Sequence, residues 1–325
     1  MVEQTLQPHP EDRDPEGCHR ITILMAVYNG GAHLAEQLDS LAAQTHGNWR
    51  LVASDDGSAD NSRSVLDAFA ADHDVETVDG PRAGASENFM SLLRRVGAAS
   101  DGDPGWLAFA DQDDIWLEDK LARSVAALAG IDPDTPALFC SRSWIADADA
   151  KPLRPSPTRP RPLGFRNALV QNVVAGNTIV VTPAAARMLC AAAAEAGPVV
   201  IHDWWVYQVM SGAGAVLIHD DTPTLHYRQH GANEIGANDS ARERARRIGM
   251  ILNGRYRTWN ETNISALRRS SARLLPENRE RLERFAEMRR APLPLRLWKL
   301  GRLHLYRQST MSTVALWVAA LLHRL

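Results

Sequence analysis

The chain is poor in cysteine and has no pattern that would join the cysteines it contains. Cys18, Cys140 and Cys190 lie far apart among 325 residues and form no C-x-x-C pair. This spacing gives no indication of a zinc site or of a disulfide framework. Because 45% of the residues are hydrophobic, the chain can instead bury a sizeable core. We expect a globular protein of a reducing compartment, the cytoplasm.

Long apolar runs are also missing. Residues 314–322 form the longest one, well short of the roughly 20 residues that a membrane-spanning helix needs. Trp317 inside this run and basic residues on both sides suit a helix lying at a membrane interface, but a terminal helix packed on its own domain fits equally well. Residues 1–19 contain no apolar segment of the signal-peptide kind and are rich in Pro, Asp, Glu and Gln, so we expect a disordered tail.

Acidic side chains are scarce in the last quarter of the chain. Residues 241–325 carry 19 basic and six acidic side chains, whereas residues 1–240 carry 17 basic and 33 acidic ones. The basic residues alternate with Leu, Glu and Ala at helical spacing, which favours a surface for anionic lipid or a lipid-linked diphosphate over nucleic acid. Salt bridges to the acidic part of the chain, or contact with a second subunit in a homodimer, explain the same charge and stay open.

Strand and helix patterns alternate through the first third of the chain. Short apolar runs predict strands at 21–27, 49–54, 76–78 and 106–110, separated by helical patterns at 34–41, 62–70 and 88–96. This alternation predicts a parallel α/β sheet. A Pro- and Arg-rich loop at 151–162 follows, then strands at 177–181 and 214–218 around a helix at 183–196, and from 240 onward only helical patterns.

Polar side chains cluster where three of these strands end. Tyr28-Asn29 follows the first strand, Asp55-Asp56 the second, and Asp111-Gln112-Asp113-Asp114 the fourth. In open α/β sheets ligands bind at the carboxyl ends of the strands. Two acidic loops would repel a diphosphate unless a cation lay between them, and these oxygen ligands suit Mg²⁺ or Mn²⁺. Helix capping by the same aspartates is the alternative for each loop taken alone.

Two further motifs hold groups that could take part in catalysis. His202-Asp203-Trp204-Trp205 sets a candidate general base beside rings that could stack on a sugar. Tyr227-Arg228-Gln229-His230-Gly231 offers a cation for a diphosphate leaving group and an imidazole for a metal. The structural alternatives are a capped helix with core tryptophans and a surface turn. A Gly-rich P-loop with its lysine is absent.

In this order, the motifs resemble those of family-2 glycosyltransferases, and in particular of a rhamnosyltransferase-like branch. The resemblance covers residues 20–236 and depends on the segments 26–30, 54–60, 111–116, 202–205 and 227–231. It implies a GT-A fold, an α/β, Rossmann-like and mostly parallel mixed sheet flanked by helices. The nucleotide-binding half would occupy 20–115 and the acceptor-binding half 116–239, followed by a basic helical extension at 240–325.

The same resemblance implies a reaction and a role for each residue. The reaction would be the inverting transfer of a sugar, L-rhamnose in this branch, from a dTDP- or UDP-linked donor to a glycan or lipid-linked glycan, in surface polysaccharide synthesis at the inner membrane face. A catalytically silent binding subunit and a sugar-nucleotide pyrophosphorylase are the alternatives, although the Gly-rich basic loop of the second is missing. The implied roles are nucleotide-sugar binding by Ala26, Tyr28, Asn29, Asp55, Asp56, Asn88, Asp111, Gln112 and Arg228, metal binding by Asp113, Asp111 and His230, acceptor binding by Trp204, Trp205 and Asn177, and base catalysis by Asp203.

Overall fold

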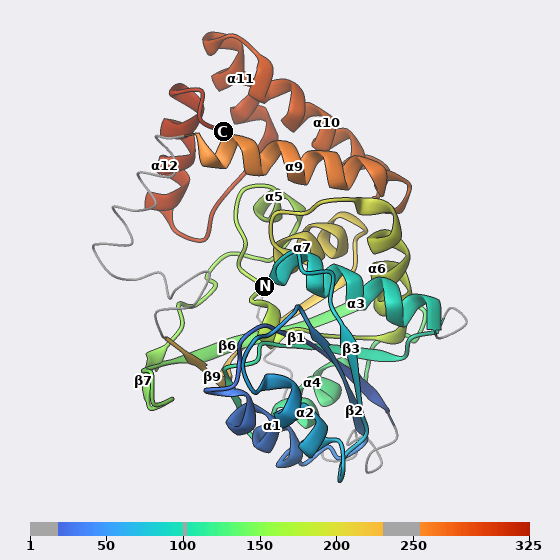
Figure 1. The fold of residues 1–325 in the computed structure, drawn as a ribbon. Coiled ribbons are helices and arrows are strands. Elements are labelled where there is room, and N and C mark those ends of the chain that lie inside the picture. The colour runs from blue at the N-terminus through green and yellow to red at the C-terminus, as the bar shows by residue number, and fades with distance from the viewer. Residues whose placement is uncertain (1–18, 100–102, 230–253) are drawn as a thin grey trace.

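One mixed β-sheet organises the protein (Figure 1). The computed structural model describes residues 19–99, 103–229 and 254–325, so the expected disordered tail lies almost wholly outside the described residues. The strands lie in the order β3-β2-β1-β4-β8-β6-β9-β5, and β7 pairs with β6. Their bounds are β1 Ile21–Val27, β2 Trp49–Asp55, β3 Val75–Asp79, β4 Trp106–Ala110, β5 Ile115–Trp116, β6 Ala137–Ala146, β7 Pro152–Pro155, β8 Val180–Val181 and β9 Val216–Arg228.

The first four strands run parallel, because a helix returns the chain to the same edge of the sheet after each of the first three. The order of the strands turns at β1, which lies between β2 and β4. The carboxyl ends of β1 and β4 therefore meet at a switch point, where sheets of this type bind ligands. Strand β8 then pairs antiparallel with both β4 and β6, so the sheet is mixed, as expected for the GT-A fold.

Helices cover both faces of the sheet and separate two apolar cores. Helices α1 (Leu34–Ala42), α2 (Ser62–Phe69) and α4 (Lys120–Leu128) enclose one core, which includes Ile23 of β1 and Phe139 of β6. The other core lies against α3 (Ala85–Ala99), α6 (Pro183–Ala196) and α7 (His202–Gly212), with the single-turn α5 (Phe165–Ala168) beside α7. Leucine, valine and isoleucine at helical and strand spacing supply most of both cores.

The C-terminal residues form four helices that lie beyond α5, α6 and α7, on the side away from α1 and α2 (Figure 1). They are α9 (Arg255–Arg269), α10 (Pro276–Arg290), α11 (Leu293–Leu303) and α12 (Thr310–Leu321). Leu267, Leu282 and Phe285 belong to the same core cluster as Phe109 of β4, so the extension packs directly on the sheet domain. Among the described residues no helix has the length and apolar character needed to cross a bilayer.

Three parts of the second half differ from the sequence expectations. Residues 177–181 form a 3₁₀ turn (Gly176–Thr178) before the two-residue β8, and β7 lies inside the expected loop at 151–162. Strand β9 runs on to Arg228, well past the expected end at residue 218. Strand β6 was not expected at all, because Ser141, Arg142 and Ser143 interrupt its apolar pattern; neighbouring strands on both sides hold it in the sheet nonetheless.

Candidate active site

Hydrogen bonds join the loops that follow β1, β2 and β4, as the strand order predicts. The Tyr28 amide donates to Gln112 Oε1 over 2.8 Å, and Gln112 Nε2 donates back to the Tyr28 carbonyl over 3.0 Å. Asn29, in the left-handed region at φ 48°, accepts from the Ala59 amide through Oδ1 (2.8 Å). A Cβ on Gly30 would lie 2.7 Å from Cδ of Gln112, so only glycine allows this close approach. The three loops therefore form one connected surface.

The residues expected to bind the nucleoside lie on this surface or directly beneath it. Ala26 is half-buried in β1, and Tyr28 leaves 58% of its surface exposed. The Asp55 carboxylate accepts from the Ser58 amide over 2.9 Å. Asp56 is buried, and its two oxygens accept from the Arg82 and Gly84 amides over 2.6 and 2.8 Å, which fixes the loop after β3. Contact of these residues with a nucleoside stays a prediction.

Asn88 lies below the nucleoside surface. Its side chain, at the start of α3, is buried and donates through Nδ2 to the Ser54 carbonyl over 2.9 Å. The amide thus ties α3 to the end of β2. Its burial favours a supporting role for this residue, beneath the groups that a nucleoside would touch.

Carboxylates crowd the loop after β4. Asp111 and Asp113 are half-buried, and Asp114 is fully buried beneath them. Burial, and then repulsion from Asp111 and Asp113, holds the pKa of Asp114 well above its usual range. A divalent cation at Asp111 and Asp113 would relieve this repulsion, and carboxylate oxygens are the donors that Mg²⁺ or Mn²⁺ prefers, so these residues fit such an ion.

The described residues contain no group of three or more His, Cys, Asp or Glu side chains placed to hold a metal by themselves. Mg²⁺ is commonly held by one or two carboxylates together with substrate phosphates, so Asp111 and Asp113 suffice for a site of that type. The third expected ligand, His230, lies outside the described residues.

The expectation that Arg228 binds a diphosphate is wrong, because its guanidinium is already engaged inside the protein. The residue is 2% exposed; Nε donates to the Asp113 carbonyl over 2.9 Å, one terminal nitrogen donates to the Ala148 carbonyl over 2.7 Å, and the other pairs with Glu36. Its backbone amide also reaches Asp114, over 3.3 Å. Arg228 thus fixes the acidic loop from below.

Asp203 has the environment of a general base. It stands in the first turn of α7, where Asn172 Nδ2 donates to Oδ1 over 2.8 Å and the Gly176 amide donates to Oδ2 over 3.0 Å. Burial raises its pKa to about 6, although these donors act in the opposite direction. The carboxylate is therefore charged at neutral pH but more basic than an ordinary aspartate.

His202 forms the apolar floor next to this carboxylate. Its ring stacks on Phe89 at 3.9 Å between centroids and lies 5.9 Å from Phe109. Burial lowers its pKa to about 3, so the imidazole is neutral. A Cβ on Gly176 would lie 2.7 Å from His202 Nε2, so glycine is needed where the backbone of this loop passes over the ring.

Burial contradicts the expected acceptor-binding roles of three residues. Trp205 is fully buried, and Trp204 is 3% exposed with its indole nitrogen donating to the Ala168 carbonyl over 2.7 Å. Asn177 is 3% exposed and donates through Nδ2 to Asp114 over 2.5 Å. The rings belong to the core, which was the structural alternative for this motif, and Asn177 supports the acidic loop.

Lys120 and Asn172 were missed by the sequence analysis. Lys120 is fully buried with Nζ 3.7 Å from the centroid of the Trp116 ring, and burial lowers its pKa to about 7 while Asp114 opposes the change. Its position six residues after Asp114 was the available signal. No local pattern distinguishes Asn172, because its role arises only where its loop meets α7.

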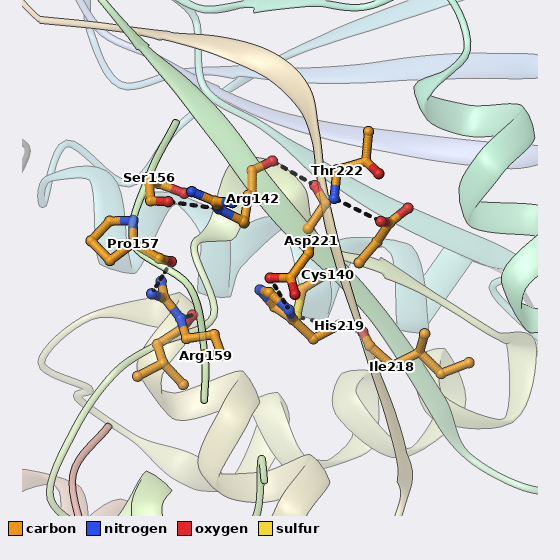
Figure 2. Close-up of polar contacts among 12 residues, drawn as sticks. Cys140, Arg142, Ser156, Pro157, Arg159, Ile218, His219, Asp221 and Thr222 are labelled. Carbon is orange, nitrogen blue, oxygen red and sulfur yellow. Dashed lines mark hydrogen bonds and ion pairs between the residues drawn. The ribbon is translucent and has the colours of Figure 1, made fainter. Parts of the chain in front are cut away.

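A group of cationic side chains lies on the acceptor half, between β6 and the segment after β7 (Figure 2). Arg142 Nε donates to the Ser156 carbonyl over 2.6 Å, and Arg159 donates to the carbonyls of Pro157 (2.7 Å) and Val173 (3.1 Å). Val173 directly follows Asn172, so Arg159 holds the loop whose amides contact Asp203. The pKa of His219 is lowered, by burial first and then by Arg159, and its imidazole is neutral at physiological pH.

Comparison with known proteins places these features in a family. The model described as Glycosyl transferase family 2 matches residues 22–191, more than half of the chain. The dTDP-rhamnosyl transferase RfbG of Shigella flexneri is 25% identical over 241 residues, which cover 72% of this chain and 81% of that protein. The UDP-Glc:alpha-D-GlcNAc-diphosphoundecaprenol beta-1,3-glucosyltransferase WfgD of Escherichia coli is 26% identical over 108 residues, covering 33% of this chain and 40% of that protein.

The fold is similar to that of a solved enzyme. Residues 1–349 of S. aureus TarS, crystallised in complex with UDP-GlcNAc, superimpose with a TM-score of 0.52 at 14% identity, covering 87% of this chain and 80% of that one. At this level of identity the likeness concerns the fold.

Proposed function

Because the chain belongs to glycosyl transferase family 2, we propose that it transfers a sugar from a nucleoside-diphosphate donor to an acceptor hydroxyl with inversion at the anomeric carbon. One observation carries the proposal. Asp203 is a buried carboxylate, fixed by Asn172 and Gly176, whose pKa of about 6 suits a general base at neutral pH.

The proposed step needs a single base. Asp203 accepts the proton of the acceptor hydroxyl while the acceptor oxygen bonds to the anomeric carbon, and the bond from that carbon to the diphosphate oxygen breaks. One displacement inverts the configuration, so no second carboxylate has to act as a nucleophile. The two hydrogen bonds to Asp203 hold it in one orientation, which favours proton transfer from a correctly placed hydroxyl.

Asp111 and Asp113 would hold Mg²⁺ or Mn²⁺. When bound, the ion neutralises negative charge on the departing nucleoside diphosphate. The chain keeps these two carboxylates in position through Arg228, Asn177 and the buried Asp114. Participation of His230 remains a prediction.

The donor and acceptor follow from the relatives. Similarity to a dTDP-rhamnosyl transferase supports L-rhamnose from dTDP-rhamnose as the transferred sugar, with a UDP-linked sugar as the alternative donor. The E. coli relative is named for a diphosphoundecaprenol-linked acceptor, which supports a lipid-linked glycan as the acceptor here. The enzyme would then act in surface polysaccharide synthesis, in the cytoplasm at the inner face of the membrane. A homodimer stays open.

Donor turnover tests the proposal. Purified protein is mixed with a panel of nucleotide sugars in Mg²⁺, Mn²⁺ or EDTA, and the released nucleoside diphosphate is measured. Release from one donor, abolished by EDTA, is expected. Asp203→Asn should lower turnover by a factor of about 10² or more, while donor-induced thermal shifts persist.

The matched control for this substitution is Asp221→Asn, at a carboxylate whose side chain is 70% exposed. Normal turnover of Asp203→Asn would refute the assignment of the base. Donor-induced thermal shifts without turnover, even with lipid-linked acceptor present, would instead indicate a silent binding subunit.

A further inference from the structure

Exposed apolar side chains concentrate on α11 and α12. Of the thirteen large hydrophobic residues that are exposed in the described part of the chain, nine lie between residues 293 and 322. Trp298 leaves 61% of its surface exposed, and Met311 leaves 83%. The nine residues, which we term the apolar face, are Leu293, Leu295, Trp298, Met311, Val314, Trp317, Val318, Leu321 and Leu322.

The spacing of these residues gives each helix one outward apolar stripe. On α12, Met311, Val314, Val318 and Leu321 recur every three or four residues, while Leu316, Ala319 and Ala320 fill the inner side. Both sides of α12 are therefore apolar, a pattern typical of a helix that is covered on both sides.

The stripes of α11 and α12 are neighbours. A Cβ on Gly301 of α11 would lie 3.6 Å from the Trp317 ring of α12, and Gly301 lies one turn from Trp298. The apolar face is thus continuous across the two helices. Monomeric soluble proteins seldom expose such extended patches, which commonly mark sites of protein or membrane contact.

Charge distinguishes between the partners that could cover this face. Residues 288–325 contain seven basic and no acidic side chains. Arg290, Arg302 and Arg324 are exposed and form no ion pair with another described residue, and the Arg302 guanidinium lies 5.7 Å from the Trp298 ring. Between described residues, the pair Arg273–Glu195 is the one ion pair that joins the extension to the rest of the protein. Salt bridging to the acidic domain therefore leaves most of this charge unused.

A second copy of the chain fits this face poorly, because two identical surfaces with only basic charges would repel each other. Anionic phospholipid is complementary in both respects, since its headgroups attract arginine and its acyl region accepts tryptophan and leucine. We infer that the apolar face of α11 and α12 docks on an anionic membrane surface, with Trp298 and Trp317 at the headgroup level.

The docked helices connect directly to the loop of the candidate base. Gln308, just before α12, is 7% exposed; its amide donates to Gln171 Oε1 over 2.8 Å, and its side chain accepts from the Arg161 amide over 3.0 Å. Asn172, the next residue after Gln171, holds Asp203. Docking would thus place the acceptor half beside the bilayer, where a lipid-linked acceptor resides. This consequence rests on the proposed function, whereas the docking itself does not.

Vesicle flotation of the full-length protein tests the docking without donor or metal. We expect binding to vesicles that contain about 30% phosphatidylglycerol, little binding to pure phosphatidylcholine, and release in about 0.5 M salt. Trp298→Ser combined with Val314→Ser and Val318→Ser should weaken binding at least about tenfold. The control, Leu153→Ser with Val216→Ser, removes exposed apolar groups elsewhere and should bind like the unchanged protein.

Thermal unfolding and donor turnover in detergent-free buffer check that the triple variant is folded. Equal binding of the triple variant and the control would overturn the inference, as would absence of binding to anionic vesicles at low salt. A dimer at micromolar concentration that the triple variant abolishes, without vesicle binding, would show that the face is a subunit interface. Binding by a protein without turnover would refute the proposed function alone, and turnover without binding would refute the docking alone.

Discussion

Removal of the hydrogen bond from Asn172 to Asp203 should shift the pH dependence of catalysis. The Asn172 amide donates to Asp203 Oδ1 over 2.8 Å and lowers the pKa of this carboxyl, which burial has raised to about 6. Asn172→Leu has a similar volume and removes the donor without opening space for water. The charged carboxylate then loses a hydrogen bond while the neutral acid loses little, so the pKa must rise.

The size of the shift follows from the energy of the bond. A hydrogen bond to a charged group contributes about 1.5–3 kcal/mol, and one pKa unit corresponds to about 1.4 kcal/mol. Because Asp203 retains some contact with solvent, the lower end of this range applies, and the pKa should rise to about 7. A base must be ionised to accept a proton, so the rate falls below the pKa. The variant should lose about twofold at pH 7 and about fivefold at pH 6.

The assay is the pH dependence of kcat/KM with donor and acceptor. The acidic limb of the profile should move upward by about one unit, with the plateau at high pH changed much less. Gln171→Leu is the matched control, since it removes an amide from the same loop that contacts Gln308 and not Asp203. An acidic limb that stays in place in Asn172→Leu, or that moves equally in both variants, would refute the role of this hydrogen bond.

Two further predictions concern the core and the cysteines. Trp205→Ala should lower the free energy of unfolding by about 3–5 kcal/mol, measured by urea denaturation, because the ring is fully buried; an effect below about 1 kcal/mol would contradict its place in the core. Cys140 and Cys190 should react with a thiol reagent at pH 8 at least about 100-fold more slowly in the native protein than in denaturant, because burial raises the pKa of both thiols to about 12. Rapid labelling of either residue under native conditions would show that it is more accessible than the structure indicates.

The sequence predicted those elements that carry a strong pattern of their own. Strand β1, strand β4 and helix α6 begin and end at the expected residues, because each is a continuous apolar or alanine-rich run bounded by polar or Gly/Pro positions. The convergence of the loops near Tyr28, Asp56 and Gln112 was also predictable, since strand order alone brings the carboxyl ends of parallel strands together. Strand β6 was not predictable, because its polar middle is held in place by neighbours distant in the sequence.

Residue roles were harder to predict than residue positions. A motif states which side chains are near each other along the chain but not whether they face solvent. Trp204, Trp205 and Arg228 are buried, and their expected ligand contacts fail for that reason. Asn172 illustrates the opposite error, since a polar residue in an ordinary loop acquires its role through a helix that begins thirty residues later.

The apolar core shared by the sheet domain and the C-terminal helices has a consequence for unfolding. Leu267, Leu282 and Phe285 pack in one cluster with Phe109 and Trp205, so the two regions cannot separate without exposing the same interior. Heating or denaturant should therefore melt them in a single cooperative transition. A protease that cuts before α9 should leave a nicked but associated protein. Deletion of residues 254–325 would expose the inner faces of α6 and α7, and the shortened chain should aggregate.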